Sequence, residues 1–519
     1  MIKKIFTHFE GINGLIAALY ITVLFVLRAL TVDTYNIWIL LLMSAVIFGL
    51  VLILCPKIFG GIRKLTLPSE FPTYTVKEKR IWTGIFFLVN FVFWLIRYLS
   101  IYPGGFVIDS INQYTQAVNN SYNDWHPALH TFLFFTVPYK ITGQVGSIVF
   151  MQIFYLSLAL TYAETVLMKY AGKKYAVITM FFLLLNPAIH SLAVIPTKDI
   201  AFSISSMVLM AYVLHIYFTK GKWINKSGNL IAFAVFAVLA TIFRHNAILF
   251  ILPLCVAVMF CIEKKQIIKF ISLFLLLFFL IKVPLYAVIG VQKAEKRSVE
   301  MAGLPMTIIS NVVKENPDAM DEELKEFVYS IAPQESWDSY QCGNFNSVKW
   351  GKEGKVFNLE VLDDVGIVDI CLLAGKSIIL EPRASLQAMA VLFNRVVGID
   401  GEVDWHPYTE TADNTVGLEK YKGGIIDDFF LAYADIIRES VFKYLFYFTG
   451  ILNLIIIVVL LAKMKFKTDW KKMLLCIPLV VHNLGTMLFL SGIDFRFFIV
   501  SFFVFPSILL IMLKQNDNV

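Results

Sequence analysis

Charged side chains are scarce in this sequence. Asp, Glu, Lys and Arg make up 16% of its 519 residues, whereas a soluble globular protein carries about 25%. The chain therefore has too little charge to cover the surface of a soluble protein of this size. Its 58% hydrophobic residues and mean hydropathy of +0.71 favour a polytopic helical membrane protein. The same numbers exclude a soluble enzyme, a nucleic-acid-binding protein and a disordered chain.

Cysteine is also sparse, with six residues, and no Cys/His spacing is typical of a metal site. Four cysteines lie in or at the ends of apolar runs: Cys55, Cys255, Cys261 and Cys476. Cys342 and Cys371 lie in a more polar region, and their spacing neither requires nor excludes a disulfide between them. We expect no bound metal.

The net charge of +7 averages two unlike parts of the chain. Residues 290–440 hold 14 Lys and Arg against 26 Asp and Glu, a net charge of −12. The remainder holds 31 basic and 12 acidic residues, a net charge of +19. The acidic block is typical of a water-exposed domain, and the basic remainder is typical of membrane helices with cationic cytoplasmic loops.

Long apolar runs predict about twelve membrane-spanning helices. A span needs about 20 apolar residues, so some of these runs are short enough to need tilt or partners. The runs lie near residues 12–30, 36–55, 81–101, 147–167, 175–191, 199–218, 230–243, 247–262, 267–289, 441–463, 473–491 and 496–513. An even number of spans returns both termini to one side.

Lysine and arginine predict the orientation. Every second loop is basic, as cytoplasmic loops usually are, and the N-terminus is basic too, which places both termini in the cytoplasm. The basic clusters lie at residues 3–4, 57–80, 169–174, 220–226, 264–269 and 463–472. The alternation holds if segment 128–141 does not cross, so we expect residues 109–141 to form helices on the outer membrane surface.

These patterns divide the chain into four parts. Residues 1–80 are expected to hold two spans and a cytoplasmic loop, and residues 81–289 a transmembrane core with an outer loop at 102–146. Residues 290–440 are expected to form one mainly helical extracytoplasmic domain of ordinary size. Residues 441–519 hold the last spans.

Ionisable groups gather at the expected outer ends of the spans. Five carboxylates outside the acidic domain face outward: Asp33, Asp109, Asp124, Asp199 and Asp494. A proton- or ion-coupled transporter more often places such groups near the membrane midplane. Outer loop 102–127 carries Asp109 just after the helix-breaking Pro103-Gly104-Gly105 and ends at Asp124-Trp125-His126-Pro127. Asp109 is a candidate base beside an apolar bundle, with a simple helix N-cap as the alternative.

Three further outer turns carry charge. Lys198 and Asp199 begin one span. The plainer interpretation is that Asp199 caps the helix and Lys198 is a surface lysine beside it. Arg244-His245-Asn246 forms a short hairpin, and an arginine is unusual at an outer turn. Asp494 and Arg496 lie in another hairpin, where a local ion pair is the alternative.

This arrangement resembles the GT-C class of integral-membrane glycosyltransferases, which use polyprenyl-phosphate sugars. The resemblance covers most of residues 81–513. It rests on the loop YPGGFVIDSINQY with Asp109, on the outer hairpins PTKD and FRHN, and on a sizeable extracytoplasmic domain before the last spans. It implies a GT-C-like, all-α fold and inverting single displacement at the outer face of the membrane.

The resemblance also implies roles for individual residues. Asp109 would be the catalytic base, and Lys198, Arg244 and Arg496 would contact the lipid phosphate. The remaining candidate substrate contacts are Asp199, His126, Asp494 and His245. No metal and no cofactor are expected, since protein cations would stabilise the leaving phosphate.

The partners implied are membrane lipid, a polyprenyl-phosphate sugar, and a cell-surface glycan or lipid acceptor, with no nucleic acid. The expected location is a bacterial plasma membrane. Two alternatives stay open: a transporter or flippase for lipid-linked sugars, and a polysaccharide polymerase or ligase.

Overall fold

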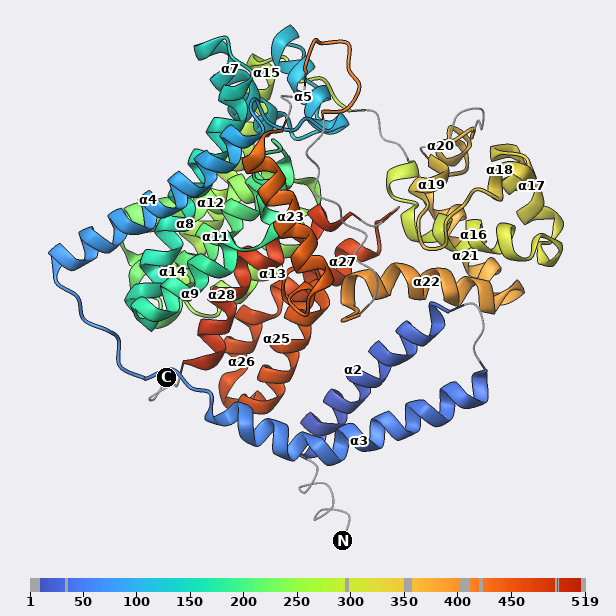
Figure 1. Ribbon diagram of the computed structural model, residues 1–519, viewed down its shortest axis with the longest axis horizontal. Helices are drawn as coiled ribbons and strands as arrows, with labels where there is room; N and C mark the ends of the chain where they lie inside the picture. Colours follow the sequence, from blue (N-terminus) through green and yellow to red (C-terminus); the bar gives the residue numbers. More distant parts are fainter. Residues whose placement is uncertain are drawn as a thin grey trace.

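The computed structural model describes residues 10–32, 36–294, 298–349, 357–400, 411–419, 423–490, 492 and 494–514. Secondary structure in these residues is helical, apart from three isolated β-bridges. Figure 1 shows a bundle of long helices with a smaller helical lobe to its right and a helical hairpin below that lobe. The long helices confirm the expectation of an all-helical, multi-pass membrane protein.

The hairpin consists of α2 (Gly11–Leu30) and α3 (Ile37–Lys64). Asn36 begins α3 because its side chain accepts hydrogen bonds from the backbone N–H groups of Trp38 and Ile39. Both helices pack against α25 in the C-terminal part of the bundle. Most of the apolar surface of α3 remains uncovered by protein, as suits a lipid-facing helix.

The bundle is built around one almost fully enclosed helix, α11 (Lys198–Phe218), which packs against α8, α12 and α28. The surrounding long helices are α4 (Val76–Ser100), α8 (Gly146–Ala171), α9 (Lys173–Leu184), α12 (Ser227–Ile242), α13 (Ile248–Met259), α14 (Lys264–Leu280), α25 (Thr449–Lys463), α26 (Phe466–Cys476), α27 (Pro478–Met487) and α28 (Val500–Leu513). Helix α14, in contrast to α11, is largely exposed on its apolar surface.

The expected number of spans is not confirmed. Seven helices in the described part of the chain are long and apolar enough to cross a membrane, and three more apolar helices are shorter. The other two expected spans are interrupted. Run 175–191 breaks where Asn186-Pro187 begins the short helix α10 (Pro187–Leu192), and run 473–491 breaks before Pro478. Proline cannot donate the backbone hydrogen bond that a continuous helix requires.

Short helices gather at one end of the bundle, where Figure 1 places α5, α7 and α15 together. This end holds α5 (Ile108–Asn119), α6 (Ala128–His130), η1 (Thr131–Thr136), α7 (Val137–Thr142), η3 (His245–Ala247), η4 (Ile281–Leu285), α15 (Tyr286–Val288) and η7 (Phe495–Phe498). Two of these, η1 and η4, are π-helical. Residues 109–141 therefore form short helices, as expected, and their place at the membrane surface stays a prediction.

The basic residues lie at the opposite end. Lys514 donates to the backbone oxygens of Glu70 and Tyr170, and Lys472 donates to that of Lys514. Helix α11 runs between the two ends, and its 21 residues span about 31 Å. The short helices and the basic cluster are thus a bilayer core apart; which end is extracytoplasmic stays a prediction.

The smaller lobe has its own hydrophobic core, formed by buried residues between Val299 and Ala384. Its helices are η5 (Ser298–Glu300), α16 (Gly303–Glu315), η6 (Pro317–Ala319), α17 (Glu322–Ile331), α18 (Gln334–Trp337), α19 (Asn346–Lys349), α20 (Val361–Val365) and α21 (Ile367–Leu380). No disulfide joins Cys342 to Cys371.

Two helices of the expected 290–440 domain leave this lobe. Helix α22 (Pro382–Val397) begins against α16 and α21, and its end packs on Leu24 of α2 and Met487 of α27. Helix α23 (Ile425–Glu439) packs against α4 and α10 of the bundle and is followed by α24 (Lys443–Phe446). The boundaries 290 and 440 stay a prediction, but the separate core covers only part of that range.

Candidate functional site

Asp109 owes its position to a tight approach of two backbone segments. Gly104 adopts φ +118°, and a Cβ there would lie 2.5 Å from Cγ2 of Val149 and 3.0 Å from the carbonyl oxygen of Val194. The next residue, Gly105, donates its N–H to the same Val194 oxygen. Only glycine fits this backbone and this space. The contact fixes the start of the segment that carries Asp109 beside the segment that leads into α11.

Gln152 of α8 shapes that second segment. Its side-chain amide donates to three backbone carbonyls within residues 192–195 and accepts from the N–H of Thr197. Ser110, next to Asp109, donates to the carbonyl of Pro196. These buried polar groups satisfy one another, as the interior of a membrane protein requires. As a result the first turn of α5 lies against the first turn of α11, which begins at Lys198.

Asp109 lies at the centre of a group of cations. Its Oδ2 is 3.6 Å from Lys198 Nζ and 3.1 Å from an Arg496 Nη1. The residue that caps α5 is Val107, and Asp109 follows inside the first turn without a capping hydrogen bond. The N-cap alternative is therefore wrong for Asp109. Its carboxylate instead joins α5, α11 and η7.

A buried ion pair lies next to this carboxylate. Asp199 Oδ1 is 3.1 Å from Arg244 Nη1, and the two side chains are 1% and 5% exposed. Arg244 also donates to the carbonyl of Phe497 and packs over the rings of Phe497 and Phe202. The arginine in this turn is thus explained by a buried partner from α11. Asp199 is not the cap of α11, whose N-cap residue is Thr197.

Arg496 connects the two pairs. It contacts Asp109, its Nε is 4.0 Å from Asp199, and it also lies 2.6 Å from Asp494 Oδ2. Asp494 begins η7 by accepting a hydrogen bond from the N–H of Arg496. The local Asp494–Arg496 ion pair is therefore present, and it belongs to a larger network. Arg496 holds three carboxylates from three different elements.

His126 completes the group from the loop between α5 and α6. Its Nδ1 accepts a hydrogen bond of 2.9 Å from Lys198 Nζ, because a lysine ammonium can only donate. Burial lowers the pKa of His126 to about 3, and the charge of Lys198 acts in the same direction. For Asp109, burial raises the pKa, but the charges of Lys198 and then Arg496 outweigh it and hold the pKa at about 2. His126 is therefore neutral and Asp109 ionised at neutral pH.

The structure brings seven of the eight predicted site residues into one connected network. This network, the Asp109 cluster, consists of Asp109, His126, Lys198, Asp199, Arg244, Asp494 and Arg496. It pairs three acidic with three basic side chains, so each cation already has a carboxylate partner. The catalytic and binding roles of these residues stay predictions.

The eighth residue, His245, points to a neighbouring cluster. Its Nε2 lies 3.0 Å from the backbone oxygen of Asp124. The Asp124 carboxylate is 2.7 Å from Lys282 Nζ and accepts a hydrogen bond of 3.2 Å from the Tyr286 hydroxyl. Asp124, Lys282 and Tyr286 are not among the predicted site residues. The sequence held two signals, since Asp124 lies in the predicted outer loop and Lys282 lies near the predicted outer end of an apolar run.

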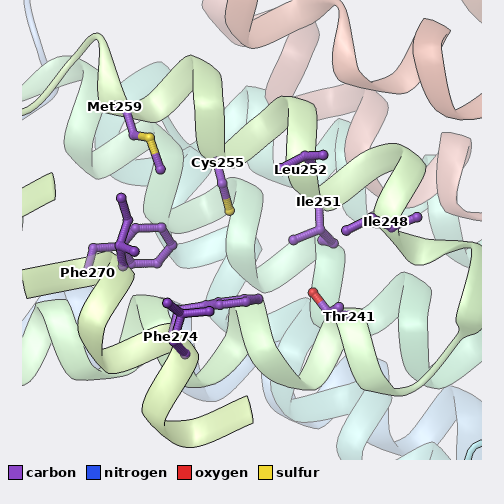
Figure 2. A pocket seen from close by; sticks show the side chains of 10 residues that line it. Thr241, Ile248, Ile251, Leu252, Cys255, Met259, Phe270 and Phe274 are labelled. Atoms are coloured by element: carbon purple, nitrogen blue, oxygen red, sulfur yellow. The ribbon is translucent and has the colours of Figure 1, made fainter. Parts of the chain in front are cut away.

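An apolar groove runs between α12, α13 and α14. It has a volume of about 130 Å³. The lining residues are Thr241, Ile248, Ile251, Leu252, Cys255, Met259, Phe270, Ile271, Phe274 and Leu275. Figure 2 shows Thr241 and Ile248 at one end of the groove, and Met259 and Phe270 at the other. Arg244 lies in the turn between Thr241 and Ile248, so the first end adjoins the turn that supplies a cation to the Asp109 cluster.

Two other buried polar pairs lie apart from these clusters. Arg97 of α4 is 2.7 Å from Asp427 of α23, and both side chains are nearly inaccessible. Glu164 of α8 accepts a hydrogen bond of 2.8 Å from the Asn90 amide of α4. Each pair joins α4 to a neighbouring helix. In the described part of the chain, no group of three or more His, Cys, Asp or Glu residues could hold a metal ion.

Comparisons with known proteins give two matches. Residues 124–340 match a family described as a family of unknown function (DUF6020), which is less than half of the chain. No curated protein matches the sequence. One solved structure matches, that of ArnT from Cupriavidus metallidurans in the apo state, with 14% sequence identity. The match covers 82% of this chain and 77% of the ArnT chain. The TM-score is 0.33. A likeness at this score assigns no activity.

Proposed function

We propose that the protein is a GT-C-like membrane glycosyltransferase that moves a sugar from a polyprenyl phosphate to an extracytoplasmic glycan or lipid. The observation that carries this proposal is the Asp109 cluster, in which one carboxylate touches Lys198 and Arg496 at an end of an apolar bundle. A carboxylate can take a proton from an attacking hydroxyl, and cations can stabilise a leaving phosphate. Transfer from a polyprenyl phosphate needs the carboxylate and the cations at the level of the lipid headgroups. It also needs an apolar surface along which the lipid chain can lie.

The phosphate contacts are assigned to Lys198, Arg496 and Arg244. Arginine suits bidentate binding of phosphate oxygens, and lysine supplies a point charge. Arg244 is buried against Asp199 and would make the innermost of the three phosphate contacts. His126 keeps the Lys198 ammonium directed toward Asp109. His245 and Asp494 orient the neighbouring backbone.

Asp109 shares its two cation partners with the proposed phosphate. Lys198 and Arg496 both contact its carboxylate and hold its pKa at about 2, which makes Asp109 a weak base. An incoming phosphate would compete for these cations and add negative charge beside Asp109. Both effects raise the pKa of the carboxylate. Donor binding would thus make Asp109 a stronger base.

The lipid chain is assigned to the apolar groove between α12, α13 and α14. One end of that groove adjoins the Arg244 turn, so a phosphate held at the cluster could extend its chain between α13 and α14. Helix α14 is largely exposed along its apolar surface, so the groove lies beside the lipid phase. The groove offers a polyprenyl chain only apolar contacts, apart from the hydroxyl of Thr241.

The reaction is a single displacement. The acceptor oxygen forms a bond to the anomeric carbon while the bond from that carbon to the phosphate oxygen breaks. The hydroxyl proton passes to the Asp109 carboxylate, and the bonding electron pair leaves with the phosphate. Attack opposite the leaving group inverts the anomeric configuration. The proposed setting is a bacterial plasma membrane with the Asp109 cluster facing outward, and the scheme uses neither a metal nor a cofactor.

The test is sugar transfer by the purified protein in lipid nanodiscs. Wild-type protein is incubated with a series of undecaprenyl-phosphate sugars labelled in the sugar, and release of undecaprenyl phosphate is followed together with label on the acceptor fraction. We expect turnover with at least one donor and a loss on the order of 10²–10⁴-fold in Asp109→Asn. Asp318→Asn serves as a matched control, because Asp318 is exposed in the separate lobe.

Several outcomes would contradict the proposal. Turnover retained by Asp109→Asn would remove Asp109 from the base role. Release of product only from an undecaprenyl-diphosphate donor would favour the polymerase or ligase alternative. Movement of intact lipid-linked sugar across a vesicle membrane, without cleavage, would favour a flippase.

A further inference from the structure

The carboxylate of Asp124 contacts three groups from two other parts of the chain. Its Oδ1 accepts from the N–H of Ala128 at the start of α6 and from the Tyr286 hydroxyl. Its Oδ2 is 2.7 Å from Lys282 Nζ. The two oxygens therefore have different tasks. Oδ1 accepts from the first residue of the short helix that follows, whereas Oδ2 contacts Lys282 in η4 at the end of α14.

The backbone around Asp124 is fixed as well. Its N–H donates to the carbonyl of Gln292, and the N–H of Gln292 donates to the carbonyl of Tyr122. His245 lies 3.0 Å from the carbonyl of Asp124. The loop before α6 is thus tied to the chain on both sides of α15 and to the Arg244 turn. Contacts from three separate segments converge on one residue of the loop.

This anchored residue is only two positions from His126. His126 is 2% exposed and contacts Lys198 Nζ, which in turn contacts Asp109. Two residues of extended chain span at most about 7 Å, so a displacement of Asp124 would be carried to the imidazole. Asp124 touches no member of the Asp109 cluster in the described contacts, and acts on it through this short link.

Lys282, the partner of Asp124, follows the helix that forms one wall of the apolar groove. Lys282 follows directly after α14, in a π-helical turn that contains Pro284. Phe274 and Leu275 on α14 line the groove. A π-helical turn inside a longer helix is often found at functional positions. The Lys282–Asp124 pair thus joins a lipid-facing helix to the loop that supplies His126.

We infer that Asp124 is a positioning residue, anchored by Lys282 and Tyr286, that holds the His126 imidazole on Lys198 and couples the α14 wall of the groove to the phosphate-binding cations. This inference rests on the proposed function for its ligand, but the anchor itself can be measured without one. Lys282 is the residue to change, because Lys282→Met leaves the hydrogen bond from the Ala128 N–H to Asp124 Oδ1 intact. Lys282→Arg keeps the positive charge. Lys140→Met is the control, since Lys140 is exposed on α7 at the same end of the bundle.

The first measurement is amide hydrogen exchange in nanodiscs without ligand. We expect the amides of residues 124–126 and of Ala128 to exchange about tenfold faster in Lys282→Met, because loss of about 1.4 kcal/mol of local stability gives this factor. Lys282→Arg and Lys140→Met should exchange as the wild type does. Unchanged exchange in Lys282→Met would overturn the anchor.

The second measurement is a double-mutant cycle on binding of undecaprenyl phosphate. We expect Lys282→Met to weaken binding about tenfold in the wild-type background, to do nothing in a His126→Ala background, and to be rescued by Lys282→Arg. An equal loss in both backgrounds would show a merely structural role and overturn the positioning role. If wild-type protein does not bind undecaprenyl phosphate at all, the proposed donor is wrong, and the exchange measurement alone decides whether Lys282 anchors the loop.

Discussion

The Oδ2 atom of Asp109 lies 3.1 Å from Arg496 Nη1, although 387 residues separate the two in sequence. The same oxygen is 3.6 Å from Lys198 Nζ. A carboxylate therefore contacts two cations that would also suit a phosphate group. This relationship makes Asp109 both the proposed base and a competitor of the proposed donor.

Removing the charge of Asp109 should strengthen phosphate binding while it removes turnover. In Asp109→Asn, Lys198 and Arg496 no longer have that carboxylate as a partner and are available to a phosphate. We expect the affinity for undecaprenyl phosphate to rise about tenfold, as for a coupling of about 1.4 kcal/mol. Titration calorimetry or thermophoresis in nanodiscs measures this. A weaker affinity in Asp109→Asn would mean that the carboxylate supports binding and does not compete with it.

Breaking the Arg244–Asp199 pair should cost stability as well as binding. Arg244→Ala leaves the fully enclosed Asp199 carboxylate without its nearest cation, a change that typically costs about 3–5 kcal/mol in a buried pair. The double variant Arg244→Ala/Asp199→Ala should recover much of the melting temperature but not the affinity for undecaprenyl phosphate. If the double variant also recovered the affinity, Arg244 would not be a phosphate contact.

Filling the apolar groove should discriminate by chain length. Cys255 lines the groove on α13, and Cys255→Trp would obstruct it. We expect affinity for undecaprenyl phosphate to fall about tenfold and affinity for the ten-carbon geranyl phosphate to stay unchanged. Ile268→Trp is the matched control, because Ile268 is 67% exposed on α14. Equal affinities in wild type and Cys255→Trp would place the lipid chain elsewhere.

His126 should make the protein less stable in mild acid. Its pKa is about 3 in the folded protein, below the ordinary value of 6.5, because burial and the charge of Lys198 disfavour its protonation. Between pH 6.5 and pH 3 the unfolded chain therefore binds a proton at this site that the folded protein does not bind, and stability falls as the pH falls. His126→Asn keeps an acceptor for Lys198 without this titration. The melting temperature of the variant relative to wild type should be constant above pH 7 and rise below pH 6. A constant difference down to pH 4 would contradict the buried, neutral imidazole.

Much of the site could be located from residue type and membrane topology. Apolar runs and basic loops predict which loops lie at each end of the bundle, and they place Asp109, Lys198, Arg244 and Arg496 at the same end. These residues stand out because few other charges occur there. The alternatives could not be separated in this way. Whether Asp109 caps its helix, and whether Asp494 pairs only with its neighbour, depends on side-chain geometry that residue spacing does not contain.

The number and continuity of the helices were harder to predict. A hydropathy run reports how apolar a segment is, and not whether its backbone remains helical. Runs 175–191 and 473–491 are apolar enough to cross but break at Pro187 and Pro478. The packing of α23 against the bundle could not be predicted either. Its acidic composition suggests a water-exposed helix, whereas Asp427 is buried in an ion pair with Arg97.

The sequence by itself determined that this is a helical membrane protein and that its scarce ionisable side chains are segregated toward helix ends, because charge is too costly to leave inside an apolar bundle. Only the tertiary structure decided which of those side chains meet. The pairing of Asp109 with Arg496, of Asp199 with Arg244 and of Asp124 with Lys282 joins segments far apart in the chain. Such contacts follow from how helices pack against one another, and that packing is set by the shapes of apolar side chains in three dimensions.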